Sequence, residues 1–564
     1  MSDKQSDLSS AHYGYDFVVA TTQQSINATL KEFLDAANEP ELVMCYVMDA
    51  NGNPQQIDYA TLRSDAKGSD PFNVPNGADP ATNQDLKNLS GASFMYAFKA
   101  KLGLPPGYAP QQVPDIVTLG LNTASVTYNL TCSEFVVVEA NYGPRGIIGW
   151  LNQSQPDGAA WLFTSKVDLR LSDTDQSAYD SLPPAVQKQI KNLGGNAFSV
   201  QQLLFDLDNA ALQTVPTISG VAPGTPLYTC LQQVFLGAYF VALQKQGKPV
   251  LGYSITQSSA PPSSLTLTDL NMKVSPFVGS DGQPVANPST QQQQLATLSY
   301  LCAANGKALP AASAFTWNWV EPADVGSYNG VVAINRNTFA SYFQTQLLPL
   351  VRNNCFQSSV RVYLSGFLDT TVNYSWSLTP GQAPTVTLPP SGATVLQFQY
   401  SSSASDDAGL GGDMGAMRLS PSLEVDVAFA GNAVTITQHL IIYLNVRSLQ
   451  TSGGGNIVDK TITDTYTLAV DQTGSLTATL TTSTADNSEN PSTNSFLNFF
   501  TDLNDIINDI ETWTRNFVGT RFNDLPISVV RGYVFPGGNT FTFKDVVFSD
   551  NQDLVSHITY VQPS

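Results

Sequence analysis

The chain is poor in the residues that most enzymes use for proton transfer and metal binding. Its 564 residues include only three histidines, His12, His439 and His557, which lie far apart in the sequence. A histidine general base or a histidine-rich metal site therefore has little support. The sequence contains no G-x-S-x-G nucleophile motif and no GxxxxGK[ST] phosphate loop. We therefore expect a protein that is not an enzyme and that holds no metal ion and no cofactor.

Basic residues are scarce as well. Only 13% of the residues are charged, and 46 acidic residues against 26 lysines and arginines give a formal net charge of −20. A surface of this sign repels the phosphate groups of nucleic acids and of anionic lipids. We expect no nucleic-acid partner, and any contact with lipid would have to be apolar.

Long hydrophobic runs and a secretory leader are also missing. The most apolar stretch, VFLGAYFVAL at 234–243, is much shorter than the roughly 20 residues that a membrane-spanning helix needs. The first twenty residues, MSDKQSDLSSAHYGYDFVVA, lack the basic and then apolar order of a signal peptide. We expect no transmembrane insertion and a cytoplasmic location after synthesis. Any release from the cell would follow a route that needs no signal peptide.

Cysteines are few and widely spaced. They are odd in number, which fits neither a disulfide framework nor a zinc site with closely paired ligands. We expect reduced and mostly buried thiols at all five positions, Cys45, Cys132, Cys230, Cys302 and Cys355.

What the chain does contain is an internal repeat. The opening YGYDFVVATTQQSINATLKEFL, at 13–34, is interpreted as an amphipathic helix. The stretch YNGVVAINRNTFASYFQTQL, at 328–347, matches it without gaps at an offset of 313 residues. Apolar positions match better than polar ones, as expected when two copies keep a packing face. On this interpretation the apolar face of the two copies comprises Val19, Ile26, Leu30 and Phe33, and then Phe339, Phe343 and Leu347.

A second helix is predicted toward the end of each half. The first begins at Pro226 and ends before Gly247 and Pro249, and the short strand after it contains Gly252 and Tyr253. The other covers 495–517 and is followed by another Gly-Tyr pair. Each half then reads as helix, strands, helix and strand. The apolar positions of these second helices include Leu231, Phe235, Leu503, Ile506 and Ile510.

Between the helices the dominant pattern has a period of two residues. Stretches such as SVTYNLTCS, SLEVDVAFA and AVTITQHLIIYLNV predict long antiparallel strands with one face in water. We expect an α+β fold that is mainly antiparallel β. The expected divisions are a first module at 1–256 with a loop-rich insertion at 51–114, a connecting segment at 257–325, and a second module at 326–564 with a flexible loop at 401–415.

The connecting segment carries two more expectations. A helix is expected from Gln291 to Ala304, and FTWNWVEP is expected to be a strand with Trp317 and Trp319 on one face. Two such tryptophans could form a platform for a carbohydrate, but alternating tryptophans in an apolar strand are more often part of a core.

Several segments resemble a known group of proteins. They are YGYDFVVATTQQSINATL at the start, NAFSVQQLLFDLDNAAL from Asn196, LSYLCAANGKALP and FTWNWVEP near the middle, GVVAINRNTF from Gly330, and FPGGNTFTFKDVVFSDNQDLVSHITYV at the end. The chain resembles the tubular lipid-binding (TULIP) superfamily. Within it, these segments are most similar to the forty-seven-kilodalton and orf-X accessory proteins of clostridial botulinum neurotoxin gene clusters.

The resemblance implies an elongated molecule of two tandem TULIP-like modules, each a long curled sheet wrapped around long amphipathic helices. It also implies a non-enzymatic carrier of a lipid or another apolar ligand, such as a fatty acid or phospholipid. The residues that would line the interior are Val19, Ile26, Leu30, Phe33, Leu231, Phe235, Phe339, Phe343, Leu347, Leu503, Ile506 and Ile510. Each of them is equally compatible with an ordinary core. The alternative is therefore a structural or toxin-accessory protein, with tubes filled by side chains and an outer surface that binds a protein partner.

Overall fold

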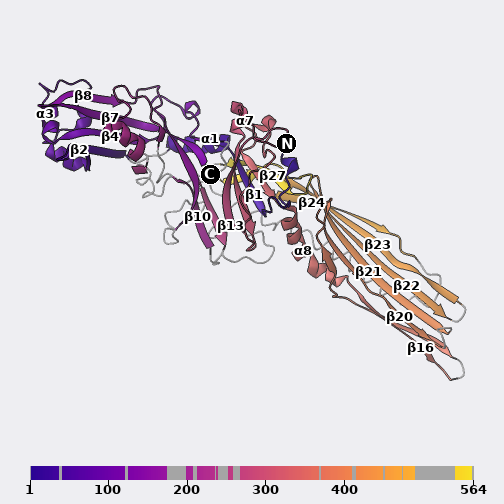
Figure 1. Ribbon diagram of the computed structural model, residues 1–564. Coiled ribbons are helices and arrows are strands. Elements are labelled where there is room, and N and C mark those ends of the chain that lie inside the picture. Colours follow the sequence, from indigo (N-terminus) through magenta and orange to yellow (C-terminus); the bar gives the residue numbers. More distant parts are fainter. Residues whose placement is uncertain are drawn as a thin grey trace.

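The structure is a computed structural model, and it shows an elongated molecule built mainly of antiparallel sheets (Figure 1). The mainly antiparallel architecture expected from the sequence is therefore confirmed. The residues that it describes are 2–36, 41–120, 125–174, 198–206, 212–235, 237–238, 252–257, 267–367, 370–409, 414–448, 451–472, 474, 476–489 and 540–561.

A central sheet joins segments from the whole length of the chain. Its strands follow the order β13-β14-β1-β15-β27-β25, and β26 also pairs with β27. The strands are β13 (Leu267–Ser275), β14 (Thr297–Ala304), β1 (Phe17–Thr22), β15 (Gly330–Ile334), β27 (Leu554–Val561), β25 (Thr540–Phe543) and β26 (Val547–Phe548). Residues from both expected modules and from the expected connecting segment thus lie in one sheet.

The two copies of the internal repeat meet in the middle of this sheet. Strands β1 and β15 pair antiparallel, and Val19 lies opposite Val332. Val332 is also the residue that corresponds to Val19 at the repeat offset of 313. Since the two equivalent residues face each other, the strands are related by an approximate two-fold axis through this pair. The outer neighbours follow the same pattern, with β14 beside β1 and β27 beside β15.

The expectation of a single helix over 13–34, with Val19 on its face, is wrong. The segment forms strand β1 and then helix α1 (Gln23–Ala36). The β-branched residues of FVVATT favour an extended backbone, and the hydroxyl of Thr22 accepts a hydrogen bond from the Ser25 amide at 3.2 Å, where the helix begins. In the second copy, β15 is followed by α8 (Arg336–Asn353), whose Asn335 cap accepts a hydrogen bond from the Asn337 amide.

At one end of the molecule lies a five-stranded sheet that we call the N-terminal arm, residues 41–102 and 132–154 (Figure 1). Its order is β3-β2-β4-β7-β8, and the short helices α2 and α3 contribute leucines to an apolar cluster on one face of the sheet. The elements are β2 (Glu41–Met48), β3 (Pro54–Ile57), α2 (Tyr59–Asp65), the 3₁₀ turn η2 (Pro71–Asn73), α3 (Gln84–Gly91), β4 (Phe94–Leu102), β7 (Cys132–Gly143) and β8 (Gly146–Ser154).

The expectation that 51–114 is a loop-rich insertion is therefore wrong. These residues contain β3, α2, η2, α3, β4 and the turn η3 (Pro110–Gln112). Helices α2 and α3 have only seven and eight residues and are polar on their outer sides, so the sequence shows no clear helical periodicity there. Asp58 caps α2 and Asn83 caps α3, so that both helices begin at side chains that satisfy their first amides.

A further sheet connects the N-terminal arm to the central sheet. Its order is β12-β10-β9-β6-β5, and β11 pairs with β9. The strands are β5 (Val117–Thr118), β6 (Ser125–Leu130), β9 (Phe163–Thr174), β10 (Phe198–Asp206), β11 (Leu212–Thr214) and β12 (Gly252–Gln257). The second helix of the first half begins as expected with α5 (Pro226–Cys230) and continues as one π-helical turn, η5 (Leu231–Phe235). The strand expected at Gly252 and Tyr253 is confirmed as β12.

At the opposite end, residues 357–486 form what we call the C-terminal arm (Figure 1). Its main sheet has the order β18-β19-β21-β22-β23-β24, with β20 paired to β21, and the hairpin β16-β17 lies against it. The strands are β16 (Gln357–Ser365), β17 (Thr371–Thr379), β18 (Thr385–Thr387), β19 (Thr394–Ser401), β20 (Ala404–Ala408), β21 (Gly415–Ala430), β22 (Ala433–Ser448), β23 (Thr451–Val470) and β24 (Leu476–Asp486).

The long strands predicted in this arm are confirmed, and the loop expected at 401–415 is wrong in part. Strand β20 occupies the middle of that range and pairs with β21 from Ala404 opposite Leu419 to Ala408 opposite Gly415. Residues 410–413 lie outside the described residues.

Two expectations for the connecting segment are also wrong. The helix expected from Gln291 to Ala304 is only the short α7 (Thr290–Gln294), and β14 follows it. All eight residues of β14 are buried, and a run that is buried on both faces has no period that separates a strand from a helix. The FTWNWVEP stretch is not a strand. It is an irregular segment before the turn η6 (Pro322–Asp324), and the first turn of the chain is η1 (Asp3–Gln5).

Candidate functional site

The described interior residues that were predicted to line a tube all lie in or against one continuous apolar cluster. Leu30 is partly buried and packs against the cluster. The others are buried, namely Val19, Ile26, Leu231, Phe235, Phe339, Phe343 and Leu347. The side chain of Phe33 and the residues Leu503, Ile506 and Ile510 lie outside the described part of the chain. Whether any of these residues contacts a ligand stays a prediction.

Phe235 fills the space between the N-terminal arm and the neighbouring sheet. Its ring centroid lies 5.3 Å from that of Phe98 on β4, 5.4 Å from that of Phe135 on β7, and 5.1 Å from that of Phe163 on β9. These separations are those of aromatic rings in direct contact. Side chains therefore occupy the interior at this position.

The second copy has a similar aromatic group at the base of the C-terminal arm. Phe339 and Phe343 of α8 lie 5.2 Å and 5.8 Å from Phe429 of β21, and Phe429 stacks on Phe548 at 4.6 Å. Close by, an enclosed hollow of about 10 Å³ lies between Val332, Leu476 and Phe543, with room for about one water molecule. The interior is thus filled near the helix as well.

Farther along the C-terminal arm, the inner face of the sheet remains apolar. Strand β21 alternates buried and more exposed residues over its whole length, from Met417 to Phe429. On β22 the buried series runs from Val434 at the base to Val446 near the tip. Both strands have 16 residues and would span about 53 Å, whereas the 18 residues of α8 span only about 27 Å. The apolar face is therefore about twice as long as the helix.

The same inner face contains a few buried polar groups on β22 and β23. Asp464 is 2% exposed, and its carboxylate accepts a hydrogen bond from the Thr482 hydroxyl at 2.6 Å. Burial raises the pKa of the Asp464 carboxyl, although this hydrogen bond partly offsets the effect. Gln438 and Lys460 are buried to a similar degree. These groups would give a ligand in this space polar as well as apolar contacts.

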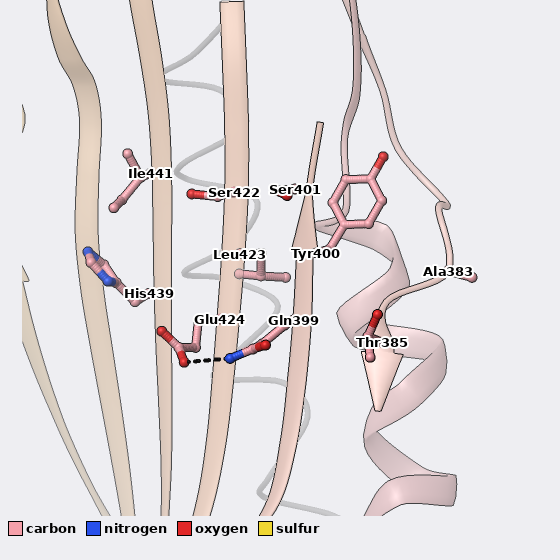
Figure 2. A pocket seen from close by; sticks show the side chains of 10 residues that line it. All are labelled: Ala383, Thr385, Gln399, Tyr400, Ser401, Ser422, Leu423, Glu424, His439 and Ile441. Atoms are coloured by element: carbon pink, nitrogen blue, oxygen red, sulfur yellow. Dashed lines mark hydrogen bonds between the residues drawn. The ribbon is translucent and has the colours of Figure 1, made fainter. Parts of the chain in front are cut away.

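The outer face of the same sheet bears an open polar hollow of about 490 Å³ (Figure 2). Gln399, Glu424 and His439 lie opposite one another on β19, β21 and β22, and the Gln399 amide donates a hydrogen bond to Glu424 at 3.1 Å. The residues that line the hollow are Ala383, Thr385, Gln399, Tyr400, Ser401, Ser422, Leu423, Glu424, His439 and Ile441.

This hollow brings serine, histidine and aspartate together without the geometry of a nucleophilic site. The His439 Nε2 atom lies 2.8 Å from Asp459 Oδ1 on β23. Ser422 faces Ile441 and is therefore diagonal to His439, and no hydrogen bond joins the hydroxyl to the imidazole. A catalytic serine needs a hydrogen bond to its base and free amides nearby that can stabilise an oxyanion. Strand β21 is paired with β19 on one side and β22 on the other, so its amides are engaged in the sheet. The hollow therefore does not support acyl transfer.

A second polar cluster fixes the start of the chain to its end. Asp553, immediately before β27, accepts hydrogen bonds from the Ser6 hydroxyl at 2.8 Å, the Leu8 amide at 2.7 Å and the Arg336 amide at 2.9 Å. Burial raises the pKa of the Asp553 carboxyl to about 6, even though these hydrogen bonds favour its charged form. These buried hydrogen bonds hold the first residues of the chain and the start of α8 against the start of β27, so we assign the cluster a structural role.

His557 on β27 lies beside this cluster. Its Nδ1 atom is 2.9 Å from Asp545 Oδ2, its Nε2 atom is 3.8 Å from Asp3 Oδ2, and its ring stacks on Tyr328. Burial alone would lower the pKa of His557, but the hydrogen bonds and charge of Asp545, with the charges of Asp3 and Asp324, raise it. Burial alone would likewise raise the pKa of Asp545, but the contacts with His557 lower it.

The remaining candidate residues are part of the core. All five cysteines are buried and none forms a disulfide, which confirms the expectation from their spacing. Trp317 and Trp319 are 3% and 1% exposed within a second apolar cluster, so they form no carbohydrate platform. Within the described ranges, no group of three or more histidine, cysteine or acidic residues could hold a metal ion, and no helix is long and apolar enough to cross a membrane.

No protein-family model and no curated protein sequence matches the chain. Among solved structures, P47 from Clostridium botulinum A2 is 10% identical, with a TM-score of 0.42 and 97% of each chain covered. The chain is similar to P47. A second structure, P47 of Clostridium botulinum E1, is 9% identical with the same TM-score, and 97% of this chain and 98% of that one are covered.

Lipopolysaccharide binding protein is also similar, at 10% identity and a TM-score of 0.28, with 98% of this chain and 99% of that one covered. The resemblance stated from the sequence thus extends to P47 and to a lipopolysaccharide binder. At these identities and TM-scores, no activity is transferred from P47 or from the other protein.

Proposed function

We propose that the protein is a non-enzymatic carrier of a lipid-like ligand, with a fold of the TULIP type. The observation that carries the proposal is the inner face of the C-terminal arm, which stays apolar from Phe429 at the base to Val446 near the tip. Helix α8 reaches only about half of that length. We place the acyl chain along the remaining part of this face, where a second helix would complete the wall.

The second helix in this proposal is the one predicted for 495–517. It supplies Leu503, Ile506 and Ile510, and α8 supplies Phe339, Phe343 and Leu347 at the base. In the first half, Val19, Ile26, Leu30, Phe33, Leu231 and Phe235 have the corresponding roles. Such sites bury most of an apolar ligand and fix its orientation with a few polar groups. Gln438, Lys460 and Asp464 lie on the same inner face.

The test is native mass spectrometry of the purified protein, followed by organic extraction and lipid analysis against a mock purification. We expect a fatty acid or phospholipid to be bound in stoichiometric amount. Leu30→Trp and Phe343→Trp add volume to the proposed space, and overpacking of about 1–3 kcal/mol should lower the lipid-loaded fraction about tenfold. The control Thr437→Trp lies on the outer face of the same sheet and should leave the loaded fraction unchanged.

Thermal unfolding of each variant shows whether it is folded. If the folded wild-type protein carries no lipid and takes up neither labelled fatty acid nor phospholipid, lipid carriage is wrong. Equal loss of lipid in Phe343→Trp and Thr437→Trp would also contradict the proposed position of the ligand.

The second candidate function is an accessory protein with a filled interior and a protein partner. The aromatic groups around Phe235 and Phe429 favour it, because there the described interior is closed by side chains. A lipid-free protein that forms a stoichiometric complex with a protein from its own gene neighbourhood would support this function.

A further inference from the structure

Exposed large apolar side chains are concentrated at one point of the molecule. Five such residues stand out among the described part of the chain, and three of them, Tyr363, Leu364 and Phe367, lie within five positions of one another. Phe367 is 100% exposed, and Tyr363 and Leu364 are 44% and 40% exposed. The other two, Ile148 and Val234, lie far from these three and from each other in the sequence. Single exposed apolar residues are ordinary, but a group of them points to an interaction site.

These three residues lie at the end of the β16-β17 hairpin, at one extremity of the molecule (Figure 1). Two other strand connections end beside the hairpin. The hydroxyl of Tyr374 on β17 donates a hydrogen bond to the Arg447 carbonyl at 2.7 Å, and Gly415 lies against the Val372 side chain. We call this end, with residues 361–367, 415–418 and 447–448, the hairpin tip. Long strands thus hold the apolar residues away from the body of the protein.

The charges at the hairpin tip are mixed. From 357 to 448 the chain has only three lysines or arginines, and all three, Arg361, Arg418 and Arg447, belong to the tip. The Arg361 guanidinium lies 5.5 Å from the centre of the Tyr363 ring. Two acidic residues offset part of this charge, because Asp406 and Asp407 lie on the adjacent β20. Three arginines against two aspartates leave an excess of one positive charge among the described residues, so the electrostatic attraction of the tip for an anionic surface is small.

We propose that the hairpin tip docks on a lipid bilayer, with Phe367 and Leu364 entering the interface between headgroups and acyl chains. Tyrosine beside arginine is typical of side chains at this depth, because the ring stays in the interface while the guanidinium reaches the phosphates. Since the tip is nearly neutral and the whole chain carries −20, the attraction is apolar and a zwitterionic bilayer suffices.

The size of the tip favours a bilayer over a protein partner. A specific protein interface buries about 800 Å² on each side and about 20–30 residues. A single hairpin end with three exposed apolar side chains offers much less, whereas shallow insertion into a bilayer needs only a few such residues. This inference rests on the proposed function, because a lipid carrier must reach a membrane to load or deliver its ligand.

The test is flotation of the full-length protein with phosphatidylcholine vesicles. We expect the wild-type protein to float with the vesicles at 0.05 M and at 0.5 M salt alike, because apolar contact is not screened. Phe367→Ser should weaken partitioning about tenfold through the loss of one buried phenyl ring. Ile148→Ser is the matched control, since Ile148 is 66% exposed on β8 at the opposite end of the molecule. It should partition as the wild-type protein does.

Three results would overturn the inference. They are no flotation of the wild-type protein, equal flotation of Phe367→Ser and wild type, or a Phe367-dependent dimer in light scattering that accounts for the exposed ring. The lipid analysis of purified protein is independent of this assay. Bound lipid without flotation would support the carrier function and contradict membrane docking by the hairpin tip. Phe367-dependent flotation of a lipid-free protein would support membrane docking and contradict the carrier function.

Discussion

The two arms of the molecule differ in how many faces of their main sheet are buried. In the N-terminal arm both faces are covered, because Phe94 and Ala97 on one face of β4 and Tyr96 and Phe98 on the other are all 3% exposed or less. In the C-terminal arm only the inner face is buried, and residues such as Gln399 and Glu424 are exposed on the outer face.

The difference comes from two short helices in the N-terminal arm. Leu62 of α2 and Leu86 and Leu89 of α3 are at most 1% exposed and form an apolar cluster with Phe94 and Trp150. This cluster forms the second covered face. The lesson is that a polar segment of the sequence can still supply a layer of core, if a few leucines fall on one side of capped helices.

The largest expected difference in the free energy of unfolding is between substitutions in the N-terminal arm and on the open face of the C-terminal arm. Leu62→Ala should lower the free energy of unfolding by about 2–5 kcal/mol, because it leaves a cavity under α2. Gln399→Ala, on the open face of the C-terminal arm, should change it by at most about 0.5 kcal/mol. Urea unfolding of both variants measures the difference. Similar losses in the two variants would mean that the arms do not differ in this way.

An intermediate effect is expected in the central sheet, which lies between the two arms. A Cβ atom on Gly330 would clash with the Ala20 carbonyl oxygen on the paired strand. Gly330→Ala should therefore destabilise the protein by about 1–3 kcal/mol. Gly91→Ala is the control, since a Cβ there meets nothing within 4 Å and Gly91 ends helix α3.

Hydrogen exchange of Gly330→Ala sharpens the comparison between the arms. If the central sheet couples them, amides of both arms should lose protection together. Loss of protection in one arm alone would show that the arms unfold independently of the central sheet.

The smallest effect depends on pH and concerns His557, which lies beside the cluster in which Asp553 binds Ser6 and Leu8. The pKa of His557 is raised from its ordinary value of 6.5, so its pairing with Asp545 and Asp3 stabilises the fold fully below pH 6.5. This contribution is lost as the pH rises through the raised pKa. His557→Gln should therefore cost about 1 kcal/mol at pH 6 and less at pH 9. A pH series of melting temperatures tests this, and a cost that grows with pH would contradict it.

Strands with one buried face could be predicted from the sequence, whereas strands buried on both faces could not. The strict alternation of the C-terminal strands was predicted because one face is in water and the other is not. Strand β14 is buried throughout, so its residues lack the alternation that would distinguish a strand from the helix expected there. Val19 was assigned to a helix for a similar reason, since β1 is also fully buried and runs directly into α1.

The candidate site could be predicted only where it depends on local periodicity. The apolar faces around Ile26 and Phe339 follow from helical spacing, and both residues are buried as such spacing requires. The polar hollow depends on the register that places Gln399, Glu424 and His439 in one row, and no local pattern reveals that register. The exposure of Phe367 likewise depends on where the β16-β17 hairpin ends.

The position of β1 in the central sheet also bears on how the chain is made. Strand β1 leaves the ribosome early, but its partners β14 and β15 begin only at Thr297 and Gly330. At about 5–20 residues per second, both edges of this apolar strand wait roughly 15–60 s for a partner. During that interval the stretch FVVATT is an unpaired β-strand with no charged residue. A chaperone that binds the nascent chain should therefore contact Phe17–Thr22 until the middle of the sequence has been synthesised.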